Sequence, residues 1–166
     1  METKRPIGLT ILCILTIINA GLSVLSNVSS LISGPDREML ENSNQILMEE
    51  AKKYEELGVD DVPILIRKLV HMYEQFFESF YTYHCIVLVI FFIGLAGAWL
   101  MFRRYILGFH LYIVYSILSV AHIYLFVNPN EVPTIYVIMT AIVSAIFIGI
   151  YARFRKWMIL ESFIKN

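Results

Sequence analysis

The chain has 166 residues, of which 58% are hydrophobic and only 16% are charged. This composition is too apolar for a soluble protein with a polar surface, so the lipid bilayer is the expected solvent. The formal net charge of −1 conceals a strong segregation of acidic and basic residues along the chain. We therefore expect an all-α membrane protein and no nucleic-acid partner.

The first predicted element is a charge-free stretch over residues 7–32, which follows Lys4 and Arg5. It is longer than the apolar region of a signal peptide, which has about 7–15 residues, and no A-x-A-like cleavage site follows it. The stretch is therefore interpreted as a first membrane-spanning helix rather than as a cleaved signal peptide.

Residues 33–83 are predicted to form a two-helix hairpin outside the membrane. Pro35 suits the first turn of a helix, and Ser33 is the expected N-cap of that helix. The apolar residues of this helix form one stripe, which needs a partner. They are Leu40, Ile46, Leu47, Ala51 and Tyr54. Gly58 is the expected residue just beyond the helix end. The simplest partner is a second amphipathic helix over 62–83, which would bury both stripes.

This second helix is predicted to continue without a break into the second span, giving one helix from about Val62 to Phe102. Its first half is amphipathic, whereas residues 84–102 carry no charge. The sequence pattern does not distinguish a straight helix from one that bends at the membrane surface. Aromatic residues mark the point where it enters the headgroup region. They are Phe76, Phe77, Phe80, Tyr81 and Tyr83.

Two further spans are predicted at about 105–127 and 132–152. The connections between the later spans are short, which forces neighbouring helices to run antiparallel and predicts a four-transmembrane-helix bundle. After the fourth span, residues 153–166 alternate basic and apolar positions. This tail is expected to lie on the membrane surface, with Trp157 at the headgroup level.

The charge map predicts the orientation. Basic residues dominate the side that holds both termini: Lys4, Arg5, Arg103, Arg104, Arg153, Arg155, Lys156 and Lys165, against Glu2 and Glu161. The segment 33–83 holds eleven acidic and five basic residues, and Glu131 lies on the same side. By the positive-inside rule, both termini are expected in the cytoplasm and the acidic hairpin on the opposite side.

Small residues recur every fourth position in two spans, at Gly94 and Ala98 and at Ala141, Ala145 and Gly149. Such rows allow helices to approach closely. We favour packing inside the bundle, and a homo-oligomer interface is the alternative. The cysteines Cys13 and Cys85 are expected in opposite leaflets, too far apart for a disulfide.

Polar side chains in the spans are the candidate functional residues. Asn27, His84, His122 and Tyr136 are predicted to lie in one leaflet, where they could line a small pocket for a lipid, a quinone headgroup, a haem or a proton path. The alternative is hydrogen bonding between helices. Asn19 and His122 are expected to face the bundle interior, because burying them in lipid without a partner costs a few kcal/mol.

Three functions stay open. The first is a non-enzymatic accessory or scaffold protein whose hairpin, residues 36–82, docks a protein partner. The second is a lipid-, quinone- or haem-binding membrane subunit. The third is a small transporter or channel, although no span carries an acidic or basic residue as such proteins usually do. No nucleophile, phosphate-loop or metal-protease motif occurs, so neither an enzyme nor a bound cofactor or metal is predicted.

Two segments carry a family resemblance. They are Ala96-Gly-Ala-Trp-Leu-Met-Phe-Arg-Arg-Tyr-Ile-Leu-Gly-Phe-His-Leu-Tyr-Ile113 and the start Lys4-Arg-Pro-Ile-Gly-Leu-Thr-Ile-Leu-Cys-Ile-Leu-Thr16. They resemble a group of small, functionally uncharacterised four-span membrane proteins of Bacteroidetes-type bacteria, which share a Met-aromatic-basic-Gly-Phe-x-x-Tyr turn. The resemblance implies a bacterial inner membrane and no particular activity, and it does not cover the hairpin 33–83.

Overall fold

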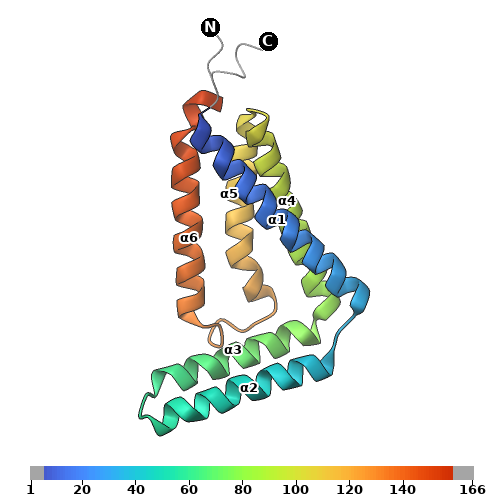
Figure 1. Ribbon diagram of the computed structural model, residues 1–166, viewed down its shortest axis with the longest axis vertical. Coiled ribbons are helices and arrows are strands. Elements are labelled where there is room, and N and C mark those ends of the chain that lie inside the picture. Colours follow the sequence, from blue (N-terminus) through green and yellow to red (C-terminus); the bar gives the residue numbers. More distant parts are fainter. Residues whose placement is uncertain (1–5, 159–166) are drawn as a thin grey trace.

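A computed structural model describes residues 6–158, which are almost entirely helical (Figure 1). The elements are α1 (Ile7–Ser33), α2 (Arg37–Glu56), α3 (Asp61–Glu78), α4 (Phe80–Phe102), α5 (Ile106–Ala121), the short 3₁₀ helix η1 (His122–Leu125) and α6 (Thr134–Arg153). Four of them are long and apolar enough to cross a membrane, namely α1, α4, α5 continued by η1, and α6. The predicted all-α chain with four candidate membrane-spanning helices is confirmed.

The helix α4 is the centre of the bundle, and both α1 and α5 pack along it. The closest approach joins α4 to α5 at Gly97 and Gly108, where a Cβ on Gly108 would lie 2.5 Å from the Gly97 carbonyl oxygen. Further along, Gly94 faces the Tyr115 ring, and Ala98 is fully buried. Two of the predicted small residues therefore serve packing inside the bundle.

The helix α6 is peripheral: it packs mainly on α5, and Tyr151 is its one buried residue. Its small residues Ala141, Ala145 and Gly149 are exposed, and a Cβ on Gly149 would meet nothing within 4 Å. The expectation that this second row packs inside the bundle is wrong. The reason is that α6 touches its neighbours along other faces and near its C-terminal end.

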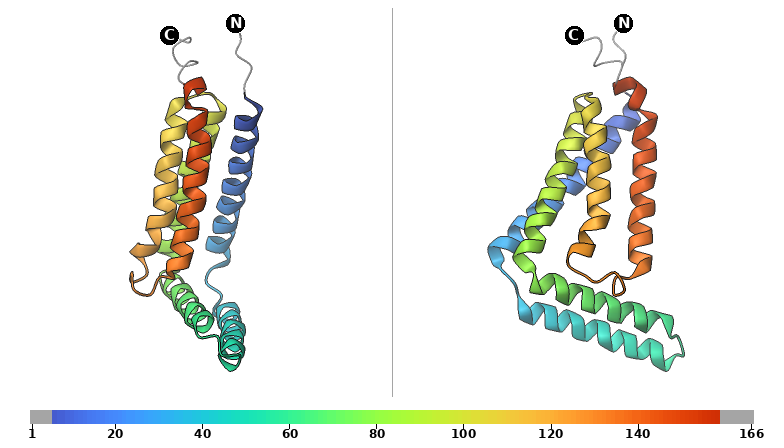
Figure 2. Two further views of the ribbon diagram at one scale, coloured as in Figure 1. Left: turned by 90° about the vertical axis from the view of Figure 1, so that its left-hand side faces the viewer. Right: turned by 180° about the vertical axis from the view of Figure 1, so that it is seen from behind.

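The predicted continuous helix over 62–102 is in fact two helices that meet at a bend at Ser79, which has φ −103° and ψ 28°. α3 lies across one end of the bundle instead of extending α4 (Figures 1 and 2). The bend places Met72 in a buried cluster with Ile123, Val127 and Val132. A straight helix would leave this apolar face of α3 without a partner, so burial favours the bend.

The two hairpin helices pack on each other as predicted, because Ala51 of α2 is buried against Ile66 and Val70 of α3. An ion pair also joins Glu55 to Arg67 across the hairpin. Not every residue of the predicted stripe takes part: Ile46 is 64% exposed and points away from α3.

Helix ends explain two details of the hairpin. Gly58 follows α2 with φ +74°, and its amide donates to the Glu55 carbonyl while the Val59 amide donates to Tyr54. This is the glycine-terminated end predicted from the sequence. The N-cap prediction is wrong, because α1 continues through Ser33 and the side chain of Asp36 accepts a hydrogen bond from the Met39 amide, at 3.0 Å.

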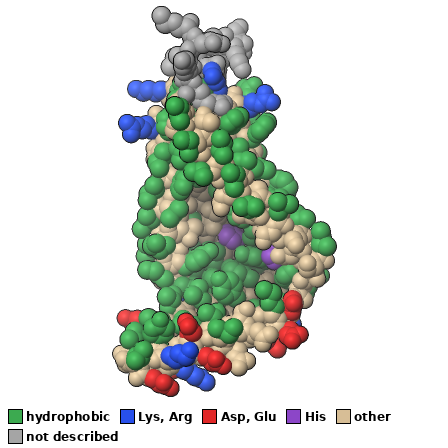
Figure 3. Space-filling view, viewed as in Figure 1, with side chains coloured by type: hydrophobic (Ala, Val, Ile, Leu, Met, Phe, Trp, Pro, Cys, Tyr) green, Lys and Arg blue, Asp and Glu red, His purple; other side chains and the backbone are tan. Residues whose placement is uncertain are grey.

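Charged side chains gather at the two ends of the molecule (Figure 3). At the end near both termini, the tight turn between α4 and α5 holds Arg104 at φ +72°, a conformation that usually favours glycine. The Arg104 guanidinium lies 4.6 Å from the centre of the Trp157 ring. Trp157 packs against the buried cluster at this end of the bundle. The rest of the predicted surface tail, residues 159–166, lies outside the described residues.

Candidate functional site

The four candidate spans border a cavity of about 850 Å³, which is seen as a hollow in the face of the molecule (Figure 3). All four contribute to its wall. Its polar lining residues are Thr16, Asn19 and Ser23 of α1, Tyr83 of α4, Tyr112, Tyr115, Ser116 and Ser119 of α5, His122 of η1, and Tyr136, Thr140 and Ser144 of α6. None of the described Asp, Glu, Lys or Arg residues lines this cavity, so its polarity comes from neutral groups.

Tight packing closes the cavity toward the termini. The hydroxyl groups of Thr16 and Tyr151 are 2.7 Å apart and form a buried hydrogen bond between α1 and α6. The Tyr112 ring lies 4.7 Å from the Tyr151 ring, measured between centroids. Beyond them Leu9, Cys13 and Met101 are fully buried in one cluster.

Aromatic side chains close the opposite end, beneath the hairpin. The Tyr83 ring stacks on Phe76 of α3 at 4.4 Å and meets the edge of Phe126 at 5.5 Å. The loop before α6 is held to α3 as well, since Lys68 donates to the Asn130 carbonyl and His71 contacts Glu131 at 3.1 Å. The hairpin therefore covers this end of the cavity.

The cavity is open toward the side. α1 and α6 lie close together near the termini, but α1 leans away from α6 toward the hairpin (Figures 1 and 2). The hydrogen bond between Thr16 and Tyr151 joins the two helices at the narrow end. Beyond it the cavity is open at the side of the bundle, where Figure 3 shows the hollow.

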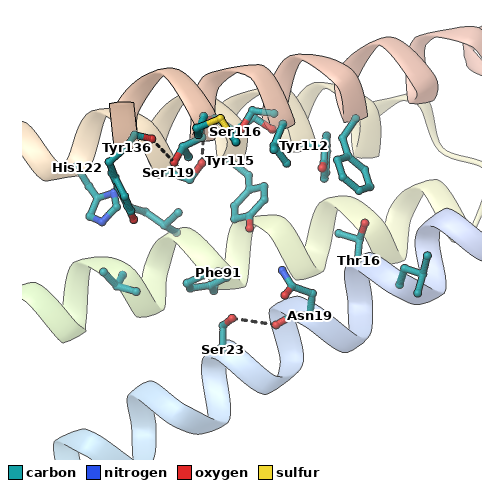
Figure 4. A pocket seen from close by; sticks show the side chains of 18 of the residues that line it. Thr16, Asn19, Ser23, Phe91, Tyr112, Tyr115, Ser116, Ser119, His122 and Tyr136 are labelled. Atoms are coloured by element: carbon teal, nitrogen blue, oxygen red, sulfur yellow. Dashed lines mark hydrogen bonds between the residues drawn. The ribbon is translucent and has the colours of Figure 1, made fainter. Parts of the chain in front are cut away.

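The polar side chains of the lining fall into two groups. Ser23, Ser119 and Thr140 each donate a 2.9 Å hydrogen bond to a carbonyl of their own helix. In contrast, the Asn19 carboxamide and the Tyr115 hydroxyl have no hydrogen-bond partner among residues 6–158. Figure 4 shows both side chains extending into the space between the helices. These two groups are available to bind a molecule inside the cavity.

The structure divides the four predicted site residues into two pairs. His122 and Tyr136 line the cavity, and the His122 Nδ1 atom lies 3.3 Å from the Leu118 carbonyl of its own helix. His84 and Asn27 do not line the cavity; instead, the His84 Nδ1 atom is 2.7 Å from the Asn27 side-chain oxygen. His84 is paired with Asn27 outside the cavity that His122 lines, so the two histidines do not share a position in this cavity.

The sequence predicted that Asn19 faces the interior. It did not identify Tyr115, the second side chain without a hydrogen-bond partner among residues 6–158. A signal was present in the spacing of the polar residues of α5 and η1, which recur along one face at helical spacing. These are Tyr112, Tyr115, Ser116 and Ser119 of α5 and His122 of η1. Tyr136, Thr140 and Ser144 of α6 repeat every four positions in the same way.

Chemically, the cavity is suited to holding a neutral polar group in apolar surroundings. Among residues 6–158, no cluster of three or more His, Cys, Asp or Glu side chains is arranged to hold a metal ion. Hydroxyl and carboxamide groups can donate and accept hydrogen bonds without carrying charge. The site therefore offers recognition by hydrogen bonding.

Comparison with protein-family models, curated proteins and solved structures gave no match to this chain. The resemblance to small four-span proteins of Bacteroidetes-type bacteria stays a prediction from the sequence.

Proposed function

We propose that this protein binds a lipidic molecule with an uncharged polar head, such as an isoprenoid quinone or a neutral glycerolipid, in the lateral cavity. One observation carries the proposal: the cavity opens at the side of the bundle, and two polar groups without a hydrogen-bond partner among residues 6–158, Asn19 and Tyr115, extend into it. In a bilayer that side would face the lipid chains. The volume of about 850 Å³ lies within the range of small-molecule sites.

Unpaired polar groups inside a bilayer are energetically costly. Leaving a carboxamide or hydroxyl unpaired in an apolar medium costs a few kcal/mol, and within a bilayer no bulk water is present to satisfy it. A carbonyl or hydroxyl headgroup would pair with Asn19 and Tyr115 and remove that cost. A charged headgroup fits poorly, because none of the described ionised side chains lines the cavity to neutralise it.

We further propose a membrane orientation. The basic end of the molecule would lie in the cytoplasm with both termini, and the acidic hairpin on the opposite surface, by the positive-inside rule. The segregated charges in Figure 3 support this placement. A bacterial inner membrane is the proposed location, on the basis of the family resemblance. We do not propose a channel, because the buried cluster near the termini blocks a path from the cavity to that end.

The test is native mass spectrometry of the protein extracted from its own membrane in mild detergent, followed by identification of the released molecule. Asn19→Leu and Tyr115→Phe remove the unpaired groups and are each expected to raise the Kd about fivefold, and so to lower the bound fraction by up to that factor, since one hydrogen bond contributes about 1 kcal/mol. Thr140→Ala is the matched control, because that hydroxyl lines the same cavity but bonds to its own helix. Equal retention in all three variants would refute the proposal.

A second candidate is an accessory role in which the hairpin docks a protein. Its support is the surface that α2 and α3 leave uncovered, where Met39, Ile46 and Leu57 are each more than half exposed among acidic residues. Ile46→Glu and Leu57→Ser should then release a partner that co-purifies with the wild-type protein. An unchanged set of co-purifying proteins would exclude this role.

A further inference from the structure

A second cavity, of about 600 Å³, lies where α1, α2, α3 and the start of α4 meet. It is separate from the lateral cavity and shares none of its lining residues. One wall is aromatic and consists of Tyr73, Phe77 and Phe80. A second wall carries the hydroxyl groups of Ser30 and Ser33, and a third holds the Asp36 carboxylate.

The aromatic wall is built by the bend at Ser79. Phe77 ends α3 and Phe80 begins α4, and their rings meet edge to face with centroids 6.3 Å apart. His84 contacts the Phe80 ring at 4.4 Å and is itself fixed by Asn27, so the wall is supported from behind. Tyr73 extends it one helical turn further along α3. Aromatic faces attract cations because of their negative π-electron density.

The carboxylate is that of Asp36, the N-cap of α2. One oxygen accepts the hydrogen bond from the Met39 amide, so the other is available to a ligand. A second carboxylate lies beside the cavity, since Glu74 accepts a 3.2 Å hydrogen bond from Asn44, which lines it, and the neighbouring Arg37 is paired with Glu41 at 3.5 Å. α1 ends here with partial negative charge, whereas α2 begins here with partial positive charge, which the Asp36 carboxylate offsets. The aromatic wall and the acidic side chains favour a cation.

We propose that this second cavity holds the ammonium group of a zwitterionic phospholipid headgroup, such as that of phosphatidylethanolamine. The ammonium group lies against the aromatic wall and the Asp36 carboxylate. The hydroxyl groups of Ser30 and Ser33, at the last turn of a candidate span, donate to the phosphate oxygens. The position suits such a lipid, because the end of α1 and the aromatic belt both mark the headgroup level.

The experiment uses the full chain in nanodiscs that contain phosphatidylethanolamine and phosphatidylglycerol with identical acyl chains, in equal amounts. Native mass spectrometry reports which lipid remains bound after release into detergent. We expect the wild-type protein to retain phosphatidylethanolamine in preference to phosphatidylglycerol. Asp36→Asn should reduce this preference by up to about fivefold, since an exposed charge contact contributes at most about 1 kcal/mol. Asparagine is also a good N-cap, so α2 stays intact.

Two further variants make the test specific. Phe77→Leu keeps the apolar volume but removes a π-face, and it should reduce the preference by a similar factor. Glu50→Gln removes an equal charge from an exposed position of α2 outside the cavity, leaves the Arg37–Glu41 pair intact and should leave the preference unchanged. If Glu50→Gln and Asp36→Asn act alike, the effect is general electrostatics and the proposal is wrong. It is also wrong if the wild-type protein shows no preference.

A competition experiment distinguishes a lipid ligand from a soluble amine. Phosphoethanolamine and tetramethylammonium are added in solution at millimolar concentration. Displacement of bound lipid only by excess phosphatidylethanolamine supports the proposal, whereas a site that prefers the soluble amines overturns the lipid assignment. The proposed function of the lateral cavity does not depend on this result, because Asp36 and Phe77 do not line that cavity.

Discussion

Replacing Gly108 by alanine tests the central packing of the bundle. A Cβ at this position would lie 2.4 Å from the Met101 amide nitrogen and 2.5 Å from the Gly97 carbonyl oxygen. Both are backbone atoms of α4, which cannot rotate away as a side chain does. The two helices would have to separate by about 1 Å to reach normal contact at about 3.5 Å.

The expected cost follows from that separation. A gap of 0.5–1 Å forfeits roughly a quarter to a half of each van der Waals contact, and overpacking a core typically costs about 1–3 kcal/mol. Alanine has a helix propensity about 1 kcal/mol better than glycine, which offsets part of this loss. We expect a net destabilisation of about 1 kcal/mol, which is a decrease in Tm of about 2–4 °C for a chain of this size.

The assay is thermal unfolding in detergent, followed by circular dichroism. Gly149→Ala provides the matched control, since it makes the same substitution in an exposed position of α6 where nothing lies within 4 Å. This variant should be unchanged or up to about 1 kcal/mol more stable. If both variants shift Tm in the same direction by the same amount, the close approach of α4 and α5 does not exist as described.

Three further predictions concern other contacts. Thr16→Val and Tyr151→Phe each remove the 2.7 Å hydrogen bond between α1 and α6, so each should lower the free energy of unfolding by about 1 kcal/mol. In the double variant the free energy of unfolding should fall by less than the sum of the two single effects, because both remove the same bond. Cys85 is exposed and Cys13 is buried, and both carry a thiol, so a lipophilic maleimide should label one site in the folded protein and two after unfolding in SDS. Ala51→Leu places a larger side chain at a position only 1% exposed between α2 and α3, and it should speed proteolysis of the hairpin, whereas Glu49→Leu on the exposed surface should not.

Hydropathy and helix-end signals located most of the fold. The charge-free runs marked α1, α4 and α6 to within a few residues, because twenty apolar residues have few alternatives in a bilayer. Gly58 marked the end of α2, since its positive φ is costly for other residues. Arg104 adopts a similar φ although it is not a glycine. The position of the turn between α4 and α5 could therefore be predicted only from the charged pair Arg103-Arg104.

The bend at Ser79 could not be predicted from the sequence. Neither glycine nor proline occurs between Pro63 and Gly94, and the helical spacing continues across the bend. The deciding contact is tertiary, namely the burial of Met72 against Ile123 and Val127. The candidate site shows the same limit of the sequence. The polar residues in the spans could be identified one by one, but which of them line the cavity and which bond to another helix depends on where the helices cross.

The peripheral position of α6 bears on how the protein is assembled. During synthesis α1, α4 and α5 precede α6, and these three already pack against one another around α4. α6 is thus the final wall of the cavity to form, and when it docks Tyr151 reaches Thr16 and closes the narrow end. The wider side between α1 and α6 stays open in the finished bundle. Under the proposed function, a ligand would therefore enter and leave through that side without any separation of the helices.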